Sequence, residues 1–161
     1  MRRSVTNAPA GPRHTKGRAR PAKTEDAVEF TELAGIHVMV VDDNGDAREI
    51  LKSVLNYCGA LVTTVDSAAA ALKLLHEVRP DVVVSDIAMP RHNGLWLIRE
   101  IRGLRGKKGG HVPVLAISAH DDVYDRGRLL AAGFQDYLVK PVSIRDLGRA
   151  ISQLAARAVS A

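Results

Sequence analysis

From residue 36 onward, short continuous apolar runs alternate with longer stretches in which apolar residues recur every three or four positions. The short runs are typical of strands buried on both faces, and the longer stretches are typical of helices that cover a sheet. The strands are expected at residues 37–41, 61–65, 81–85, 112–117 and 135–139, and the helices at residues 45–57, 68–78, 94–104, 122–132 and 144–157.

The regular alternation of strands and helices predicts an α/β fold, in which right-handed crossovers build a parallel sheet with helices on both faces. The expected architecture is a doubly wound, flavodoxin-like sheet of five strands in the order 2-1-3-4-5. In such a sheet, ligands bind at the carboxyl edge, beside the switch point between the first and third strands. The chemistry of this chain is therefore expected at the ends of these strands.

Polar side chains of different kinds stand where four of the strands end. Asp42 and Asp43 follow the first strand, Asp86 the third, Ser118 the fourth and Lys140 the fifth. Three clustered carboxylates repel one another, and a small divalent cation that prefers oxygen ligands removes that cost. A hydroxyl and an ammonium beside the cation would suit a phosphoryl group. The sequence therefore predicts a Mg²⁺ (or Mn²⁺) and phosphoryl site at this edge.

In combination, these residues resemble the receiver domain of two-component response regulators, the CheY-like family, over roughly residues 35–158. The resemblance implies that Asp86 is the phosphoacceptor. It also implies that the metal is held by Asp43 directly, by Asp42 through water, by Asp86 and by the backbone carbonyl of Ala88.

The resemblance assigns roles to three further positions. Lys140 and Ser118 would bind the phosphoryl oxygens, and the peptide bond from Lys140 to Pro141 would be cis. Ser118 and Tyr137 would form the switch that reports phosphorylation. Ala88 and His120 depart from the common pattern beside the phosphoryl group, which leaves the lifetime of the phosphorylated form open.

The charge of the chain is unevenly distributed. Of its 23 basic residues, seven lie within residues 1–23, where there is no acid, so the other 16 face 18 acidic residues and the remainder carries a net charge of −2. Residues 1–34 are expected to form a basic, disordered extension. The lone Cys58 excludes an internal disulfide and favours a reducing, cytoplasmic setting. No apolar run is long enough for a membrane span.

We expect a single-domain response regulator that accepts a phosphoryl group from a sensor histidine kinase or a histidine phosphotransfer protein. It would be a phosphoacceptor, not an enzyme, and would signal to an unidentified protein through its fourth helix, fifth strand and fifth helix, with homodimerisation as one option. On the last helix, Leu154 and Ala158 are expected to be free to meet a partner.

Several alternatives remain. The domain could be a phosphate sink or shuttle. A phosphatase of the haloacid dehalogenase type would need a second acid two residues after Asp86, where this chain has Ala88. A DNA-binding regulator could use the basic tail, but no helix-turn-helix accompanies it, so nucleic acid is disfavoured, as is a membrane partner. A nucleotide-binding module would need the glycine-rich fingerprint G-x-G-x-x-G after the first strand, which is missing.

Overall fold

The computed structural model describes residues 31–119 and 125–160. It contains one parallel sheet, five α-helices and a short 3-10 helix, η1, within this part of the chain. The strands are β1 (His37–Val41), β2 (Leu61–Val65), β3 (Val82–Asp86), β4 (Val114–Ser118) and β5 (Asp136–Val139). The helices are α1 (Gly45–Tyr57), α2 (Ala68–Val78), α3 (Gly94–Gly103), η1 (Gly106–Lys108), α4 (Arg126–Ala132) and α5 (Ile144–Val159).

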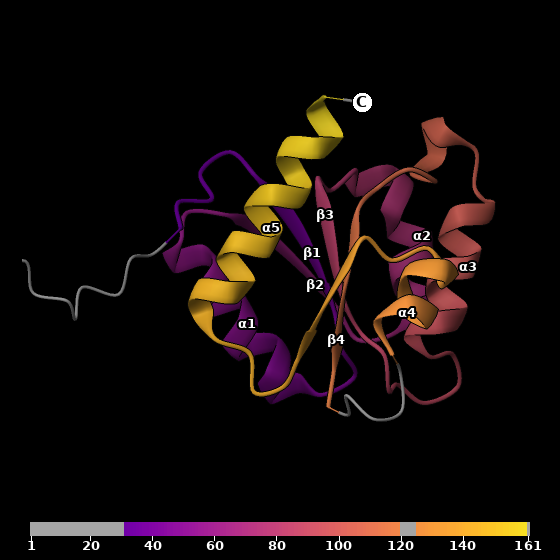
Figure 1. The fold of residues 1–161 in the computed structure, drawn as a ribbon, viewed down its shortest axis with the longest axis horizontal. Helices are drawn as coiled ribbons and strands as arrows, with labels where there is room; N and C mark the ends of the chain where they lie inside the picture. Colours follow the sequence, from indigo (N-terminus) through magenta and orange to yellow (C-terminus); the bar gives the residue numbers. More distant parts are fainter. Residues whose placement is uncertain (1–30, 120–124, 161) are drawn as a thin grey trace, which may run out of the picture.

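The sheet has the strand order β2-β1-β3-β4-β5, and all four pairings are parallel. Helices α1 and α5 cover one face, and α2, α3 and α4 cover the other (Figure 1). This confirms the predicted doubly wound fold. Strands β3 and β4 are buried along their whole length, which explains why their sequences are continuous apolar runs.

Each α-helix begins directly after a residue whose side chain accepts a hydrogen bond from the first-turn backbone. These N-cap residues are Asn44, Ser67, Asn93, Asp125 and Ser143. The helix expected from residue 122 begins instead at Arg126, because the backbone of Asp125 is extended. Strands β3 and β4 end one residue later than expected, so Asp86 and Ser118 are their last residues.

Two residues are more deeply packed than the sequence indicated. Leu33, two residues before the expected start of the domain, is fully buried, and its N–H donates to the carbonyl of Cys58 at 2.7 Å. Leu154 is only 2% exposed and packs among the side chains between the sheet and helices α1 and α5. The prediction that Leu154 is free to meet a partner is therefore wrong, whereas Ala158 is exposed.

The side chain of Arg102 joins three segments by hydrogen bonds that the sequence did not suggest. Its guanidinium donates to the carbonyls of Gly110 and Val112 at 2.8 Å each, to the carbonyl of Gly133 at 3.0 and 2.8 Å, and to Oε1 of Gln135 at 2.8 Å. Burial lowers the pKa of this guanidinium. Arg102 thus ties α3 to the loop before β4 and to the turn between α4 and β5.

We expect Arg102→Met to lower the free energy of unfolding by about 2–4 kcal/mol, because it leaves three partly buried carbonyls without their donor. The exposed Arg99 of the same helix is the matched control, and Arg99→Met should change the stability by less than about 0.5 kcal/mol. Urea unfolding of both variants measures the difference. Equal losses in the two variants would show that the hydrogen bonds of Arg102 contribute nothing specific.

Among the residues that the structure describes, no helix has the length and apolar character needed to cross a membrane.

Candidate functional site

The sheet brings the three predicted acids together at its carboxyl edge. Asp42 and Asp43 follow β1, and Asp86 ends β3, the neighbouring strand, in which Ser85 pairs with Val41. One carboxylate oxygen from each acid lies within 4.8 Å of the other two. Asp42 and Asp86 are buried, at 2% and 8% exposure, whereas Asp43 is open to solvent. An ion could therefore reach the cluster from the side of Asp43.

Lys140 lies against the two buried acids. Its Nζ is 3.7 Å from Oδ2 of Asp42 and 3.7 Å from Oδ1 of Asp86. The backbone N–H of Lys140 donates to the carbonyl of Ser118 at 2.8 Å, which fixes the position of the lysine beside the end of β4. The following peptide bond, to Pro141, is cis as predicted. The ammonium of Lys140 thus lies against two of the three clustered carboxylates.

The surroundings of Asp86 oppose its ionisation. Burial raises the pKa of the Asp86 carboxyl above its ordinary value, and the negative charge of Asp42 adds to this. Lys140 and hydrogen bonds from the backbone of Ala88 and Ile87 lower the pKa without reversing the net shift. A divalent cation at the cluster would favour the ionised form of Asp86. The excess negative charge of the three acids therefore fits the predicted metal site.

Neighbouring groups hold Asp42 in place. The backbone N–H of Asn44 donates to Oδ1 of Asp42 at 2.9 Å, and Nη1 of Arg48 donates to the backbone carbonyl of Asp42 at 2.7 Å. Neither residue was among the predicted site residues. The cap residue Asn44, directly after the acid pair, was the only signal of this arrangement in the sequence.

The loop after Asp86 depends on a close backbone approach at Gly94. The N–H of Gly94 donates to the carbonyl of Ile87 at 2.9 Å. A Cβ at this position would lie 2.7 Å from the carbonyl oxygen of Asp86, so a larger residue would push the loop after Asp86 away from α3. Ala88 is exposed in this loop, and its methyl group leaves the cluster without a further acid.

The predicted switch residues lie on the neighbouring strands. Ser118 is buried at the end of β4, one residue beyond Ile117, which pairs with Asp86. Tyr137 pairs with Ala116 and packs partly buried against the side chains between the sheet and helices α2, α3 and α4. The structure therefore places Ser118 at the same edge of the sheet as the acidic cluster, on the strand next to Asp86, and Tyr137 two strand positions before it. His120 lies outside the described residues.

A family model for the response regulator receiver domain matches residues 38–152. The chain belongs to the response regulator receiver family. An uncharacterized 14.6 kDa protein in the sodA1 3' region of Leptolyngbya boryana is 41% identical to this receiver domain over 121 residues, 75% of this chain and 91% of that protein. The response regulator MprA of Mycobacterium sp. (strain KMS) is 38% identical over 112 residues. That match covers 70% of this chain but only 47% of MprA.

Solved receiver domains share the fold. The receiver domain of the sensor histidine kinase PA1611 from Pseudomonas aeruginosa PAO1 superimposes with a TM-score of 0.69 and 30% identity, over 76% of this chain and 99% of that one. A magnesium ion is coordinated in the active-site cleft of that receiver domain. The similarity places this chain in two-component signalling, and the cluster of Asp42, Asp43 and Asp86 could hold such an ion.

The raised pKa of Asp86 predicts how the stability of this receiver domain depends on pH. At pH values between 3.8, the ordinary pKa of an aspartic acid, and the raised pKa of Asp86, the folded state binds more protons than the unfolded chain. Stability is therefore lost as the pH rises through this window. Without divalent cations, Asp86→Asn should be more stable than the wild type at pH 7, and the difference should shrink as the pH falls toward 3.8. Urea unfolding at the two pH values measures it, and a pH-independent difference would show that the ionisation of Asp86 is not its cause.

Proposed function

We propose that the chain accepts a phosphoryl group on Asp86 from the phosphohistidine of a sensor histidine kinase or a histidine phosphotransfer protein. The observation that carries this proposal is the position of Asp86. Its carboxylate is buried at the carboxyl edge, 3.7 Å from the ammonium of Lys140 and clustered with two further acids. An aspartyl carboxylate in such a place can act as a nucleophile toward phosphorus.

In the proposed reaction, a carboxylate oxygen of Asp86 forms the new bond to phosphorus while the bond from phosphorus to the donor nitrogen breaks. The electron pair of that bond returns to the donor imidazole. Asp42, Asp43, Asp86 and the carbonyl of Ala88 would hold Mg²⁺, which when bound neutralises charge on the phosphoryl oxygens. Lys140 would bind one of these oxygens, and the hydroxyl of Ser118 would donate to another.

The same geometry supports a phosphoacceptor over a phosphatase. Two residues after Asp86 stands Ala88, whose methyl group cannot donate or accept a proton. The acyl phosphate would therefore lack a general acid or base at this position, and turnover by the route of the haloacid dehalogenases is not supported. The chain would therefore act as a phosphoacceptor that assists its own phosphorylation and dephosphorylation.

With acetyl phosphate and Mg²⁺, we expect the intact mass to increase by one phosphoryl group, and Asp86→Asn to abolish the increase. The matched control is Asp66→Asn, because Asp66 also follows a strand at the carboxyl edge but is exposed and outside the cluster. Asp43→Asn should slow phosphorylation on the order of 10²-fold by weakening charge neutralisation. Phosphorylation of Asp86→Asn at the wild-type rate would refute the assignment.

An apolar surface beside the acidic cluster supports a helical phosphodonor. Ile50 and Tyr57 on α1 are 64% and 73% exposed. Ile50 lines a hollow of about 250 Å³ whose other lining residues include Pro141, and Asp42 and Lys140 of the site. The apolar surface thus continues directly into the site. We propose that an amphipathic helix of the donor lies on α1 and presents its phosphohistidine to Asp86.

Ile50→Ser should reduce the kcat/KM of phosphotransfer from a phosphorylated histidine phosphotransfer protein about fivefold or more, because a central apolar contact of the docked helix is lost. The donor is the histidine phosphotransfer protein that transfers its phosphoryl group fastest to the wild-type chain among several that are tested. Phosphorylation by acetyl phosphate should not change, since a small donor needs no docking surface. Leu130→Ser, on the exposed side of α4, is the matched control. Equal transfer rates for Ile50→Ser and the wild type would place the donor elsewhere.

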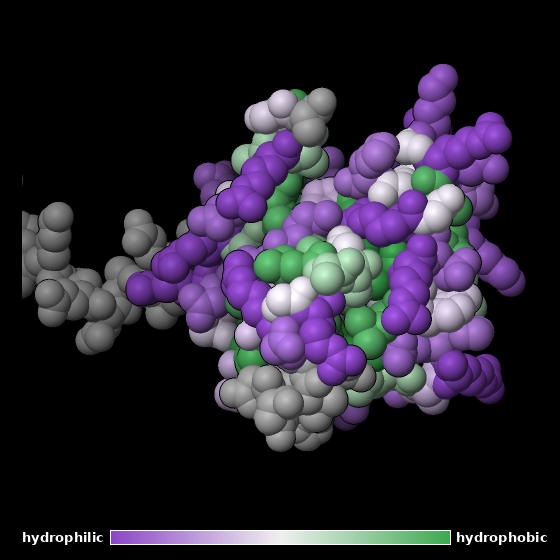
Figure 2. Space-filling model, turned by 45° about the vertical axis from the view of Figure 1, so that its right-hand side comes forward, coloured by the Kyte–Doolittle hydropathy of each residue, from purple (hydrophilic) through white to green (hydrophobic). Residues whose placement is uncertain are grey.

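For signal output, we propose the face of α4, β5 and α5. Figure 2 shows hydrophilic side chains around a small apolar area on this side of the molecule. Arg126 pairs with Asp136 at 3.4 Å, and Leu130 is a large apolar residue exposed on α4. A largely polar face of this kind suits a partner that binds transiently. Ser118 and Tyr137 would couple it to phosphorylation, with Tyr137 packed against the helices on that side of the sheet.

A further inference from the structure

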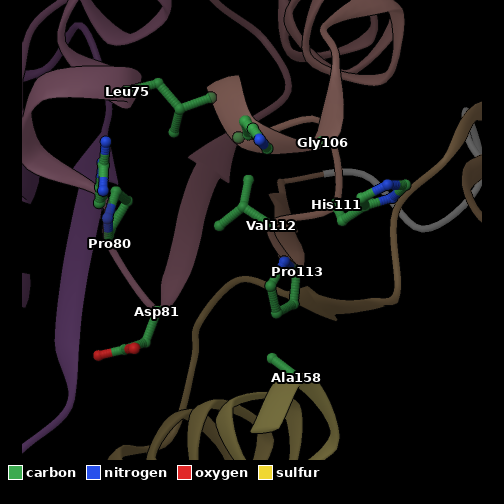
Figure 3. A pocket seen from close by; sticks show the side chains of 11 residues that line it. Leu75, Pro80, Asp81, Gly106, His111, Val112, Pro113 and Ala158 are labelled. Atoms are coloured by element: carbon green, nitrogen blue, oxygen red, sulfur yellow. The ribbon is translucent and has the colours of Figure 1, made fainter. Parts of the chain in front are cut away.

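A second hollow lies at the opposite edge of the sheet, where β3 and β4 begin (Figure 3). Its volume is about 270 Å³. The end of α2, the residues before β3, the η1 loop, the residues before β4 and the last turn of α5 all contribute to its lining. Its apolar surface comes from Leu75, Pro80, Val112, Pro113 and Ala158. None of these residues belongs to the phosphoryl site or to the donor surface.

The wall of this hollow is fixed by close packing. Gly109 has a φ of +100°, and a Cβ there would lie 2.9 Å from Cδ2 of Leu75, so the η1 loop lies directly on the end of α2. The guanidinium of Arg102 donates to the carbonyls of Gly110 and Val112 at 2.8 Å each, which fixes the segment before β4. The hollow is therefore already formed without a ligand, which lowers the entropic cost of binding.

Positive charge predominates around the hollow. Arg79, Lys107 and His111 line it from three separate segments, and Asp81 is the single acid among the lining residues. Oδ2 of Asp81 already accepts a hydrogen bond from the backbone N–H of His37 at 2.7 Å. Even with His111 neutral, the lining carries two positive charges against one negative charge. The hollow therefore attracts an anion.

We propose that this hollow binds a small organic anion: a carboxylate or phosphate group on an apolar body about the size of one aromatic ring. A cavity of about 150 Å³ accommodates a benzene ring. The 270 Å³ of this hollow leaves room for an anionic head group as well. The ring would lie against Leu75, Val112 and Pro113, and the head group would bind Arg79 and Lys107. This site is independent of phosphoacceptance by Asp86.

The test is a titration of the ¹⁵N-labelled full chain, followed by the backbone amide shifts of residues around the hollow. The probes are benzoate and phenylphosphonate, whose P–C bond cannot donate a phosphoryl group to Asp86. From the affinity typical of each non-hydrogen atom of a small ligand, the Kd should be on the order of 10 mM or tighter. Saturable shifts at Gly109, Val112 and Ala158 are expected for at least one probe, and the preferred probe identifies the head group.

Two controls separate a site from general charge attraction. Benzamide has the same ring without the negative charge and should bind about tenfold more weakly than benzoate. Lys107→Glu should weaken the preferred probe about tenfold, whereas Lys108→Glu, with the same charge change one residue away and outside the lining, should retain most of the affinity. The proposal is overturned if neither probe causes saturable shifts at these residues, if benzamide matches benzoate, or if the two lysine variants lose affinity equally.

Discussion

Repulsion among three carboxylates is the constraint on which the site depends. Asp42, Asp43 and Asp86 lie together within 4.8 Å, and the ammonium of Lys140, at 3.7 Å from two of them, leaves the cluster with an excess of negative charge. Two like charges about 4 Å apart repel by roughly 4 kcal/mol at an effective dielectric constant near 20. A structure that maintains this arrangement favours a ligand that adds positive charge, so a divalent cation fits the cluster. Such a cation would in turn offset the negative charge of the phosphoryl group that we propose is transferred to Asp86.

Packing of the buried strands offsets the repulsion among the three acids. Strands β3 and β4 are buried on both faces, so the ends of the sheet cannot move apart to relieve the repulsion. Local hydrogen bonds then orient the individual acids, from Asn44 to Asp42 and from the backbone of Ile87 and Ala88 to Asp86. The apolar surface around Ile50 reaches the same edge, so the position proposed to receive the phosphoryl group lies beside the surface proposed for a protein donor.

Much of this arrangement could be predicted from the sequence, because continuous apolar runs that end in Asp42, Asp86, Ser118 and Lys140 specify both a parallel sheet and the chemistry at its edge. The missed features depend on contacts between distant segments. Arg102 bonds to carbonyls around residues 110 and 133, and no local pattern reports this. Leu33 lies between Glu32 and Ala34 outside any apolar run, so no local pattern signals its burial. Leu154 packs among side chains of the sheet and of α1, contacts that its spacing along α5 does not report.

The most direct test of the central claim is the thermal unfolding of the wild-type chain at low ionic strength as Mg²⁺ is added. If the crowded carboxylates form a cation site, the Tm should rise and follow a binding curve, since a ligand of the folded state stabilises it. KCl at matched ionic strength should give a smaller, non-saturating change, because it only screens the charges. If MgCl₂ and KCl have the same effect on the Tm, the acidic cluster is not a cation site, and repulsion among its carboxylates does not govern what binds there.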